Sequence, residues 1–352
     1  MVKSLRDISW QVDEPTYRAD PALSYSLLAK YDREGFGAIP TLFDHIDTDS
    51  LRFGSMVDTL VTDGQEAYDS KYVTLPDDCS CGQKERDVVD VILRDNPGVT
   101  SLADVPSKAI LKALEELSYQ SRWRDDTRVK YFKERAEIYF VLKVANPDKT
   151  LVTVKDDSDA KACLRKLKYS DSTYYFFEGS PFESDEIERL YQLKFKGEGD
   201  GVAYRCMADL IVVDHTKKII HPIDLKTTGH PEYMFFESFL KWGYAHQARL
   251  YWRIIKQNIE KDDYFKDFTL LDYDFVVINR NTLNPLVWHF EDTQKTGTLV
   301  YKNPYGEVAA KIRDPYDIGK ELRGYIDCMA TVPNGIVNGD GDANSIVSWI
   351  TK

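Results

Sequence analysis

Two β-rich runs of sequence, residues 207–214 and 219–226, are separated by only four polar residues, "HTKK". A connection this short joins antiparallel neighbours, so the pattern predicts a hairpin. Pairing of Asp214 with Ile219 sets its register, because each step along one strand is matched by a step back along the other. The register matters because both runs place charged residues among apolar ones.

This register brings three charged residues together. Asp209 falls directly opposite Asp224, with the two Cβ atoms roughly 5 Å apart. Lys226 lies two residues beyond Asp224 and therefore points to the same face of the sheet. Two opposed aspartates repel each other unless a cation lies between them. The pattern predicts a site for Mg²⁺ or Mn²⁺, bound by the carboxylates together with water and substrate phosphate.

Lys226 would complete such a site chemically. An ammonium group beside the metal can hold the attacking water or stabilise the charge of the transition state. The three residues are therefore typical of metal-assisted cleavage of a phosphodiester. Taken alone, a D-x-K pattern in a strand is more often a solvated edge or an ion pair.

A long amphipathic helix, predicted over residues 236–258, carries a second polar group. Gln247 and Tyr251 are four residues apart on this helix and share one face. Among the surrounding aromatic residues, the pair either orders a site or forms a satisfied contact in the core.

The rest of the sequence predicts helices and strands around this hairpin. Helices are expected over residues 22–34 and 50–63 and up to about 120, and residues 76–100 are polar and turn-rich. Short strands are expected at "TLVTV", "LYQLKFK", "YDFVVINR" and "LVWHF", followed by a helical C-terminal stretch. The pattern predicts an α/β (α+β) fold with a central mixed β-sheet flanked by helices. We expect residues 1–352 to form a single domain.

The composition fits a globular protein of the reducing cytosol. Hydrophobic residues make up 43% of the 352, and no run of 18 apolar residues marks a membrane span. The start of the sequence has no apolar run after its basic residues, so a cytoplasmic location without a secretory signal is expected. The five cysteines are scattered, and Cys79-x-Cys81 has no second pair at ligand spacing, so no iron–sulfur cluster is expected.

Asp209, "HPIDLK" and "QARLY" follow one another in an order that resembles the PD-(D/E)xK nuclease superfamily, and more narrowly its RecB-like branch. That branch includes the nuclease domain of exonuclease VIII and related phage exonucleases. The resemblance covers roughly residues 50–75 and 130–290. It implies a restriction-endonuclease-like core with a helical N-terminal elaboration, a helical or polar insertion at 76–129 and a C-terminal extension at 291–352. The catalytic residues that it implies are Asp209, Asp224, Lys226, Gln247 and Tyr251.

The same resemblance implies further acidic residues. "LRFGSMVDTLVTD" resembles the branch's first motif, a Gly followed by a metal-binding His on a helix, with Asp58 at the His position. The alternative interpretation is that Asp58 is a solvent-facing residue of a helix without a role in metal binding. Glu188 lies where such enzymes often have an acid on the preceding strand, with Glu183 and Glu186 as alternatives. The implied metal ligands are Asp58, Asp209 and Asp224.

Contacts with DNA would have to come from local clusters of basic residues, because the net charge is −12 and the pI is near 5.1. Residues 122–135 combine six basic residues with Trp123, Tyr131 and Phe132. This composition fits a patch that tracks a backbone and stacks on bases, or a solvated helix face with a buried aromatic edge. The predicted DNA-binding residues are Arg124, Arg128, Lys217, Lys218, Arg249 and Arg253.

Together these features predict a Mg²⁺- or Mn²⁺-dependent deoxyribonuclease. The resemblance implies that it is an exonuclease, which hydrolyses linear duplex DNA from its ends and leaves a single strand. The resemblance alone implies phage or bacterial recombination, the host cytoplasm, a single-strand annealing protein as partner, and a homo-oligomeric ring as one form of assembly. The alternatives are a catalytically inactive DNA-binding protein on the same fold, a structure-specific endonuclease, and an unrelated metalloenzyme or phage structural protein.

Overall fold

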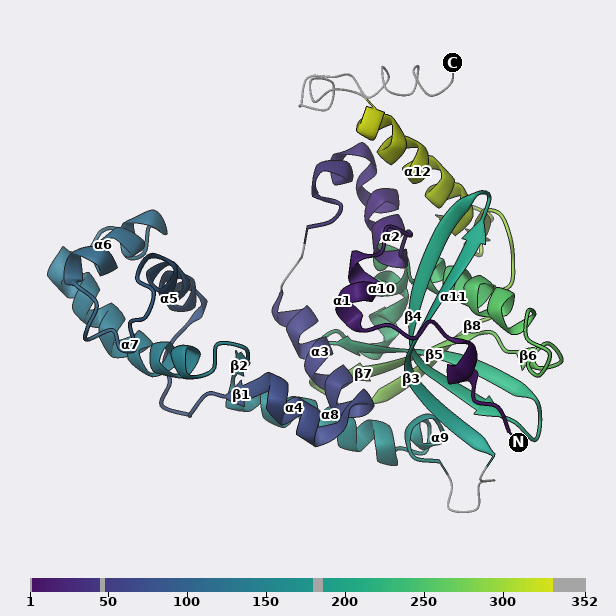
Figure 1. Cartoon of the computed structure of the whole chain (residues 1–352), viewed down its shortest axis with the longest axis horizontal. Helices are drawn as coiled ribbons and strands as arrows, with labels where there is room; N and C mark the ends of the chain where they lie inside the picture. Colours follow the sequence, from purple (N-terminus) through teal and green to yellow (C-terminus); the bar gives the residue numbers. More distant parts are fainter. Residues whose placement is uncertain (1, 45–47, 180–185, 332–352) are drawn as a thin grey trace. The chain divides into compact units, whose positions relative to one another are not determined.

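The structure, a computed structural model, describes residues 2–44, 48–179 and 186–331. The chain divides into two compact units, whose elements are shown in Figure 1. Unit 1 is formed by Met1–Gly54 together with Cys163–Lys352, and unit 2 by Ser55–Ala162.

Unit 1 is built on a mixed β-sheet with the strand order β3-β4-β5-β7-β8, and β6 lies beside β5. Neighbouring strands are antiparallel except for β5 with β7 and β5 with β6, which run parallel. Parallel neighbours need a long crossover, and the helices that follow β5 supply it. The strands are β3 (Ile187–Gly199), β4 (Val202–Asp214), β5 (Ile219–Thr228), β6 (Thr269–Leu270), β7 (Tyr273–Asn279) and β8 (Pro285–Phe290), with a separate hairpin of β9 (Leu299–Lys302) and β10 (Val308–Ile312).

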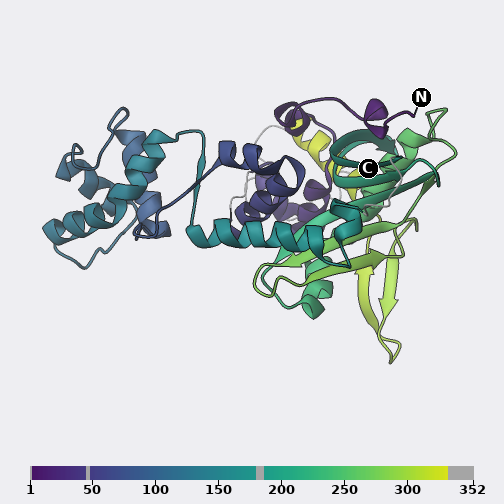
Figure 2. The same cartoon turned by 90° about the horizontal axis from the view of Figure 1, so that it is seen from below.

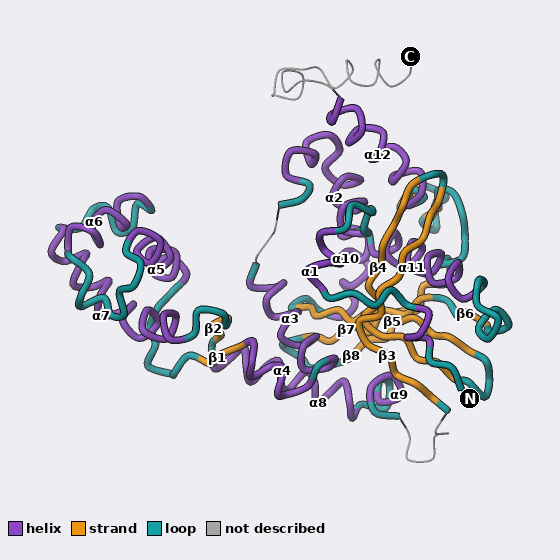
Figure 3. The backbone as a smooth tube through the Cα atoms, in the orientation of Figure 1, coloured by secondary structure: helices purple, strands orange, loops and turns teal. Residues whose placement is uncertain are grey.

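Helices cover this sheet, as Figure 3 shows. α11 contacts β3, β4 and β7 and also α2 and α12, so these helices form a layer on one face. On the other face, α9 places the ring of Phe176 5.7 Å from that of His221 on β5. The helices of unit 1 are η1 (Leu5–Ile8), α1 (Glu14–Ala19), α2 (Tyr25–Glu34), η2 (Gly35–Thr41), α9 (Tyr174–Phe177), η3 (Glu232–Met234), α10 (Phe235–Trp242), α11 (Tyr244–Ile259) and α12 (Pro315–Thr331).

One hydrophobic core joins the sheet to the helical layer. Its members include Phe195 on β3, Ile211 on β4 and Phe275 on β7, together with Leu250 and Ile254 on α11, all of them fully buried. Burial of each such side chain contributes roughly 1.5–3 kcal/mol. Every residue of β7 is buried, as expected for a central strand that is covered on both faces.

Unit 2 has a hydrophobic core of its own. Val88, Ile110 and Phe132, from α5, α6 and α7, are fully buried in it, and Leu75 and Leu151 close it. The short strands β1 and β2 pair in parallel. The elements of unit 2 are α4 (Gly64–Lys71), β1 (Tyr72–Thr74), α5 (Gln83–Asp95), α6 (Ser107–Glu116), α7 (Asp125–Ala145) and β2 (Thr150–Val152), and residues of α3 (Asp49–Thr62) and α8 (Val154–Tyr169) belong to both units.

The predicted fold class is confirmed, because a central mixed sheet flanked by helices is the architecture of unit 1. The helices expected over residues 22–34 and 50–63 are α2 and α3, and the expected strands are β2, β3, β4, β5, β7 and β8. In the described part of the chain, no helix is both long enough and apolar enough to cross a membrane.

Three elements differ from the sequence-based expectation. The helix predicted over residues 236–258 is two helices, α10 and α11, because Gly243 takes the left-handed conformation with φ 66° and ψ 37°. The segment 76–100, which was expected to be polar and turn-rich, contains α5 with its buried apolar residues. The polar turn before this helix dominates the composition of the segment. The C-terminal extension contains the β9–β10 hairpin before its helix.

The two units also differ from the expected single domain with an insertion at residues 76–129. The physical reason is the second core, which extends from Leu75 to Leu151 and so takes in α7 and β2. Unit 2, at Ser55–Ala162, is therefore longer than the insertion expected from the polar segment around residue 80.

Substitution of Gly243 tests the break between α10 and α11. A side chain in the left-handed conformation costs about 1–2 kcal/mol, and a Cβ at this position would lie 2.8 Å from Cδ2 of His246. We expect Gly243→Ala to lower the free energy of unfolding by at least about 1 kcal/mol in urea. The matched control is Gly324→Ala in α12, where a Cβ meets open space and the change should stabilise by about 0.5–1 kcal/mol. Equal effects of the two substitutions would contradict the assignment.

Candidate active site

The site is centred on Asp224 of β5, whose side chain is fully buried. Its Oδ1 accepts a hydrogen bond from Nε2 of Gln247 on α11, and its Oδ2 forms an ion pair with Nζ of Lys226. Oδ2 accepts no aligned hydrogen bond from any described residue, so its contact with Lys226 is one of charge. A buried carboxylate is tolerated only when it is paired in this way. The structure thus brings three of the predicted site residues into direct contact.

Asp209 lies beside this group, where β4 and β5 separate. The predicted register is confirmed, because the ladder begins with Asp214 opposite Ile219 and continues without a shift to the pair before Asp209. There the strands part, and Oδ2 of Asp209 accepts a hydrogen bond of 3.0 Å from the backbone N–H of Leu225. The carboxylate takes the place of a main-chain acceptor and is held at the end of the ladder, next to Asp224.

Lys226 lies between acidic and aromatic neighbours. Its Nζ is 4.8 Å from the ring centroid of Tyr244. Burial by itself would lower the pKa of Lys226, but the carboxylate of Asp224, with a further contribution from Asp209, raises this pKa above its ordinary value. The amine therefore stays charged through the physiological range. It is suited to stabilise negative charge rather than to accept a proton.

Buried tyrosines line the same region. The ring centroid of Tyr251 lies 6.4 Å from that of Tyr25 and 6.4 Å from that of Tyr273. Burial, together with nearby acidic groups that include Asp224 and Asp209, raises the pKa of Tyr251 and of Tyr273 well above the ordinary value. Both phenols therefore keep their protons and can act as hydrogen-bond donors.

Several buried polar atoms around Asp224 have no hydrogen-bond partner in the described part of the chain. Oε1 of Gln247 and the hydroxyl group of Tyr273 make no hydrogen bond with any described residue. Such atoms are rare in protein interiors, because each costs about 1–3 kcal/mol when it is left unpaired. Next to two carboxylates, they indicate a place where water, a cation or a substrate is bound. Tyr273 was not predicted, because a tyrosine in a wholly buried strand is indistinguishable in sequence from an ordinary core residue.

The residues fit Mg²⁺ or Mn²⁺ as a site of two carboxylates. Asp209 and Asp224 offer hard oxygen ligands, and such ions complete their coordination with water and substrate phosphate. Oδ2 of Asp224, which accepts no hydrogen bond from the described residues, is available to a cation if Lys226 moves aside. Among the residues that the structure describes, no group of three or more His, Cys, Asp or Glu side chains is placed to hold a metal.

Gln192 of β3 lies at the level of Asp209. The β3–β4 ladder continues on both sides of these two residues but omits them as a pair. Gln192 has a φ of 54°, which is uncommon outside glycine, and such irregularities re-aim side chains beside active sites. Gln192 was not predicted, because a polar residue in an alternating strand is typical of the solvent face.

Glu188 lies farther along β3. It is four residues, or roughly 13 Å of strand, from Gln192, and its carboxylate is 3.1 Å from Nε2 of His215. Of the two alternatives, Glu186 accepts a hydrogen bond at the β4–β5 turn, and Glu183 lies outside the described residues. A metal-binding role for Glu188 stays a prediction, and its pairing with His215 does not support it.

Asp58 belongs to unit 2 and lies on α3, four residues after Gly54. Within unit 1, a Cβ added at Gly54 would lie 3.4 Å from Oγ1 of Thr227, the residue after Lys226 on β5. The start of α3 therefore packs directly against the strand that carries the site. The metal-binding role of Asp58 itself stays a prediction.

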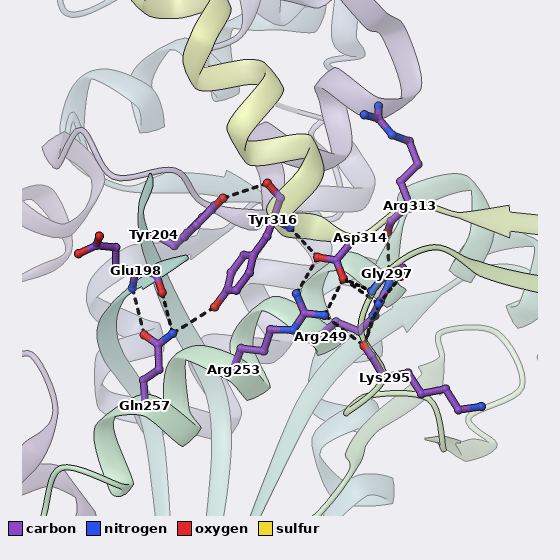
Figure 4. Close-up of polar contacts among 10 residues, drawn as sticks. All are labelled: Glu198, Tyr204, Arg249, Arg253, Gln257, Lys295, Gly297, Arg313, Asp314 and Tyr316. Carbon is purple, nitrogen blue, oxygen red and sulfur yellow. Dashed lines mark hydrogen bonds and ion pairs between the residues drawn. The ribbon is translucent and has the colours of Figure 1, made fainter. Parts of the chain in front are cut away.

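Arg249 and Arg253 hold the fold together, which corrects the prediction that they contact DNA. Arg249 is fully buried and donates to the backbone carbonyls of Lys295 and Gly297 and to the carboxylate of Asp314 (Figure 4). Arg253 donates to both oxygens of the same carboxylate at 2.7 Å. Neither guanidinium could reach a phosphate without breaking these bonds.

The remaining basic residues divide into buried and exposed. Arg128 is buried in unit 2 and donates to the backbone carbonyl of Tyr119, so its predicted contact with DNA is also corrected. The side chain of Arg124 is 85% exposed. Lys217 and Lys218 are exposed at the β4–β5 turn. DNA binding by these three exposed residues stays a prediction.

The sequence matches no protein-family model and no curated protein. Among solved structures, a protein from Eubacterium rectale described as "Putative exonuclease" is similar over 70% of this chain and 79% of its own, with 13% identical residues and a TM-score of 0.26. A likeness at this TM-score carries no argument about fold or activity. The functional case therefore rests on the geometry of the site.

Removal of the Lys226 ammonium group should expose the cost of burying Asp224. We expect Lys226→Met to lower the free energy of unfolding at pH 7 by about 3 kcal/mol or more, because it leaves a buried carboxylate without its counter-charge. Since the folded-state pKa of Lys226 is raised, its contribution is fully present below pH about 10.5 and is lost as the pH rises above that value.

Urea unfolding of the native protein and of Lys226→Met, at pH 7 and at pH 10.5 to 11, measures both effects. The difference between the two proteins should shrink at the higher pH. Lys261→Met, at an exposed position of unit 1, is the control and should remain close to native. A difference that stays constant or grows with pH would show that Lys226 is not held in its charged form by the site.

Proposed function

We propose that this protein is a metal-dependent nuclease that hydrolyses phosphodiester bonds in DNA. The observation that carries the proposal is the fully buried carboxylate of Asp224, which is held between Gln247 and Lys226 and lies next to Asp209. Buried ion pairs are often no more stabilising than apolar residues of similar volume, so stability alone does not account for this group. Two carboxylates with an ammonium suit a reaction at a negatively charged phosphate.

Each residue has a distinct task in the proposed reaction. Asp209 and Asp224 would hold Mg²⁺ or Mn²⁺, which supplies Lewis-acid activation of the phosphate when it is bound. Lys226 keeps its proton and stabilises the negative charge that develops on the phosphate. Gln247 fixes the orientation of Asp224 through the hydrogen bond to Oδ1. Tyr251 closes the buried side of the site.

Attack from DNA ends is a finer part of the proposal, and the resemblance to the RecB-like branch supports it. Linear duplex DNA would then be the substrate and a single strand the product, in phage or bacterial recombination with a single-strand annealing protein as partner. A DNA-binding protein without catalysis is the second candidate. The ion pair between Lys226 and Asp224 favours it, because this contact must open before both oxygens of Asp224 can reach a metal.

Digestion of end-labelled linear duplex DNA, with a covalently closed circle as second substrate, tests the proposal. The native protein, Asp224→Asn and Lys226→Gln are compared in Mg²⁺, in Mn²⁺ and in EDTA. We expect loss of the linear DNA alone, and only with metal. The rate should be at least about 100-fold lower in each variant, since Asp224→Asn loses a metal ligand and Lys226→Gln loses the charge that faces the reacting phosphate. Both variants are first shown to be folded by their urea transitions.

Asp263→Asn is the control, because it removes a fully exposed acid of unit 1, in the segment between α11 and β6, that belongs to no predicted site. It should digest the linear DNA at close to the native rate. Cutting of the circle would change the assignment to an endonuclease with the same site. Retention of DNA without cutting of either substrate would leave the DNA-binding candidate and exclude catalysis.

A further inference from the structure

The hairpin formed by β9 and β10 stands apart from the large sheet. In the described part of the chain its two strands pair only with each other. Figure 2 shows this hairpin, in yellow-green, extending beyond the strands of the large sheet. A two-stranded hairpin is marginally stable by itself, so its conformation must be held from outside.

A buried arginine of α11 holds the hairpin at its root. Arg249 donates to the backbone carbonyls of Lys295 and Gly297, which precede β9, and to Arg313 and Asp314, which follow β10 (Figure 4). Both ends of the hairpin are therefore tied to one side chain. The same helix supplies Gln247 to the site, so the hairpin is fixed to an element of the active site.

The two faces of the hairpin have different characters. Leu299 and Ile312 are opposite each other and buried in the core of unit 1, and Tyr301 on the same face packs against that core. The opposite face is exposed and mixes apolar with basic side chains, and no described residue covers it. Its members are Val300 paired with Lys311, and Lys302 paired with Val308.

The exposed face carries positive charge in a chain whose net charge is −12. Lys302 and Lys311 are exposed and form no ion pair with the described residues. Glu307 is the single acid between Lys295 and Arg313. Lys295 and Arg313, which flank the hairpin, are paired within unit 1, Lys295 with Asp292 and Arg313 with Asp32. Lys302 and Lys311 on the exposed face are therefore left for an external partner.

The tip of the hairpin is ordered and presents an aromatic ring. Oδ1 of Asn303 accepts hydrogen bonds from the backbone N–H groups of Tyr305 and Glu307, at 2.9 and 3.1 Å. The side chain of Tyr305 is among the most exposed aromatic groups described, at 90%. An exposed aromatic residue on an ordered backbone, beyond two lysines, is an arrangement with which proteins follow a phosphate backbone and contact sugars or bases.

We infer that the β9–β10 hairpin is an arm that holds the sugar–phosphate backbone of duplex DNA, through Lys302 and Lys311, while the site acts on the same molecule. The inference rests on the proposed function and deepens it by assigning the surface that binds the substrate. A two-stranded ribbon of this kind fits the major groove of a duplex, with its lysines at the phosphates that border the groove. Binding through the arm does not require the metal.

The double variant Lys302→Gln with Lys311→Gln tests the arm. Binding of a fluorescein-labelled blunt duplex of 30 base pairs is measured by anisotropy in EDTA, so that no hydrolysis occurs, over a series of salt concentrations. Log affinity falls as log salt concentration rises, and each lost phosphate contact should make this slope less steep by about 0.9. We expect a slope lower by about 2 and an affinity at least roughly tenfold lower at 0.1 M salt.

The matched control is Lys261→Gln with Lys320→Gln, which removes the same charge from exposed lysines of unit 1 that form no ion pair with the described residues. This variant should keep the native slope. Equal slopes for the two double variants, or no binding of duplex by the native protein in EDTA, would overturn the arm. A change in sedimentation with unchanged DNA binding would also overturn it and assign the face to a second copy of this chain.

The arm and the proposed nuclease can fail separately. Salt-dependent binding through Lys302 and Lys311 without metal-dependent hydrolysis would support the arm and refute the nuclease. Hydrolysis that depends on Asp224 and Lys226, together with an unchanged salt dependence of DNA binding in the double variant, would support the nuclease and refute the arm.

Discussion

Burial of the Asp224 carboxylate is the constraint on which the arrangement of unit 1 depends. A carboxylate without exposure needs a counter-charge and a hydrogen-bond donor, and no single element offers both. Lys226 supplies the charge from the same strand, and Gln247 supplies the donor from α11. The helix must therefore lie over β5 with Gln247 turned inward. That orientation also turns its apolar residues, such as Leu250 and Ile254, into the core beside the sheet.

The same helix is held from its other side by a second buried charge. Arg249, two residues after Gln247, is bonded to carbonyls on both sides of the β9–β10 hairpin and to Asp314. An arginine can satisfy so many acceptors because its planar guanidinium carries five donors. α11 is thus held by polar contacts both toward the site and toward the root of the hairpin. Its position is overdetermined, as a helix that orients a reactive group requires.

How much could be predicted from the sequence depended on how local each constraint is. The β4–β5 register followed from a four-residue connection, and the shared face of Asp224 and Lys226 followed from the period of a strand. The burial of Arg249 could not be predicted, because its partner Asp314 lies 65 residues away in sequence. The lack of a hydrogen-bond partner for the Tyr273 hydroxyl group, among the described residues, could not be predicted either, because it depends on which residues surround it in the fold. The polar residues at helical spacing therefore included Gln247, which contacts Asp224, but their spacing could not separate such a residue from an arginine that is paired within the fold.

An acidic chain that binds DNA must concentrate its positive charge where the backbone passes. At physiological salt the field of a charge decays over about 8 Å, so a phosphate responds to the few groups nearest to it rather than to the net charge of −12. Lys226 is held as a cation inside the site, and Lys302 and Lys311 are presented on the hairpin. The acidic remainder would repel DNA that approaches elsewhere. Binding would then depend on alignment with the hairpin and the site together, which favours productive contacts over non-specific ones.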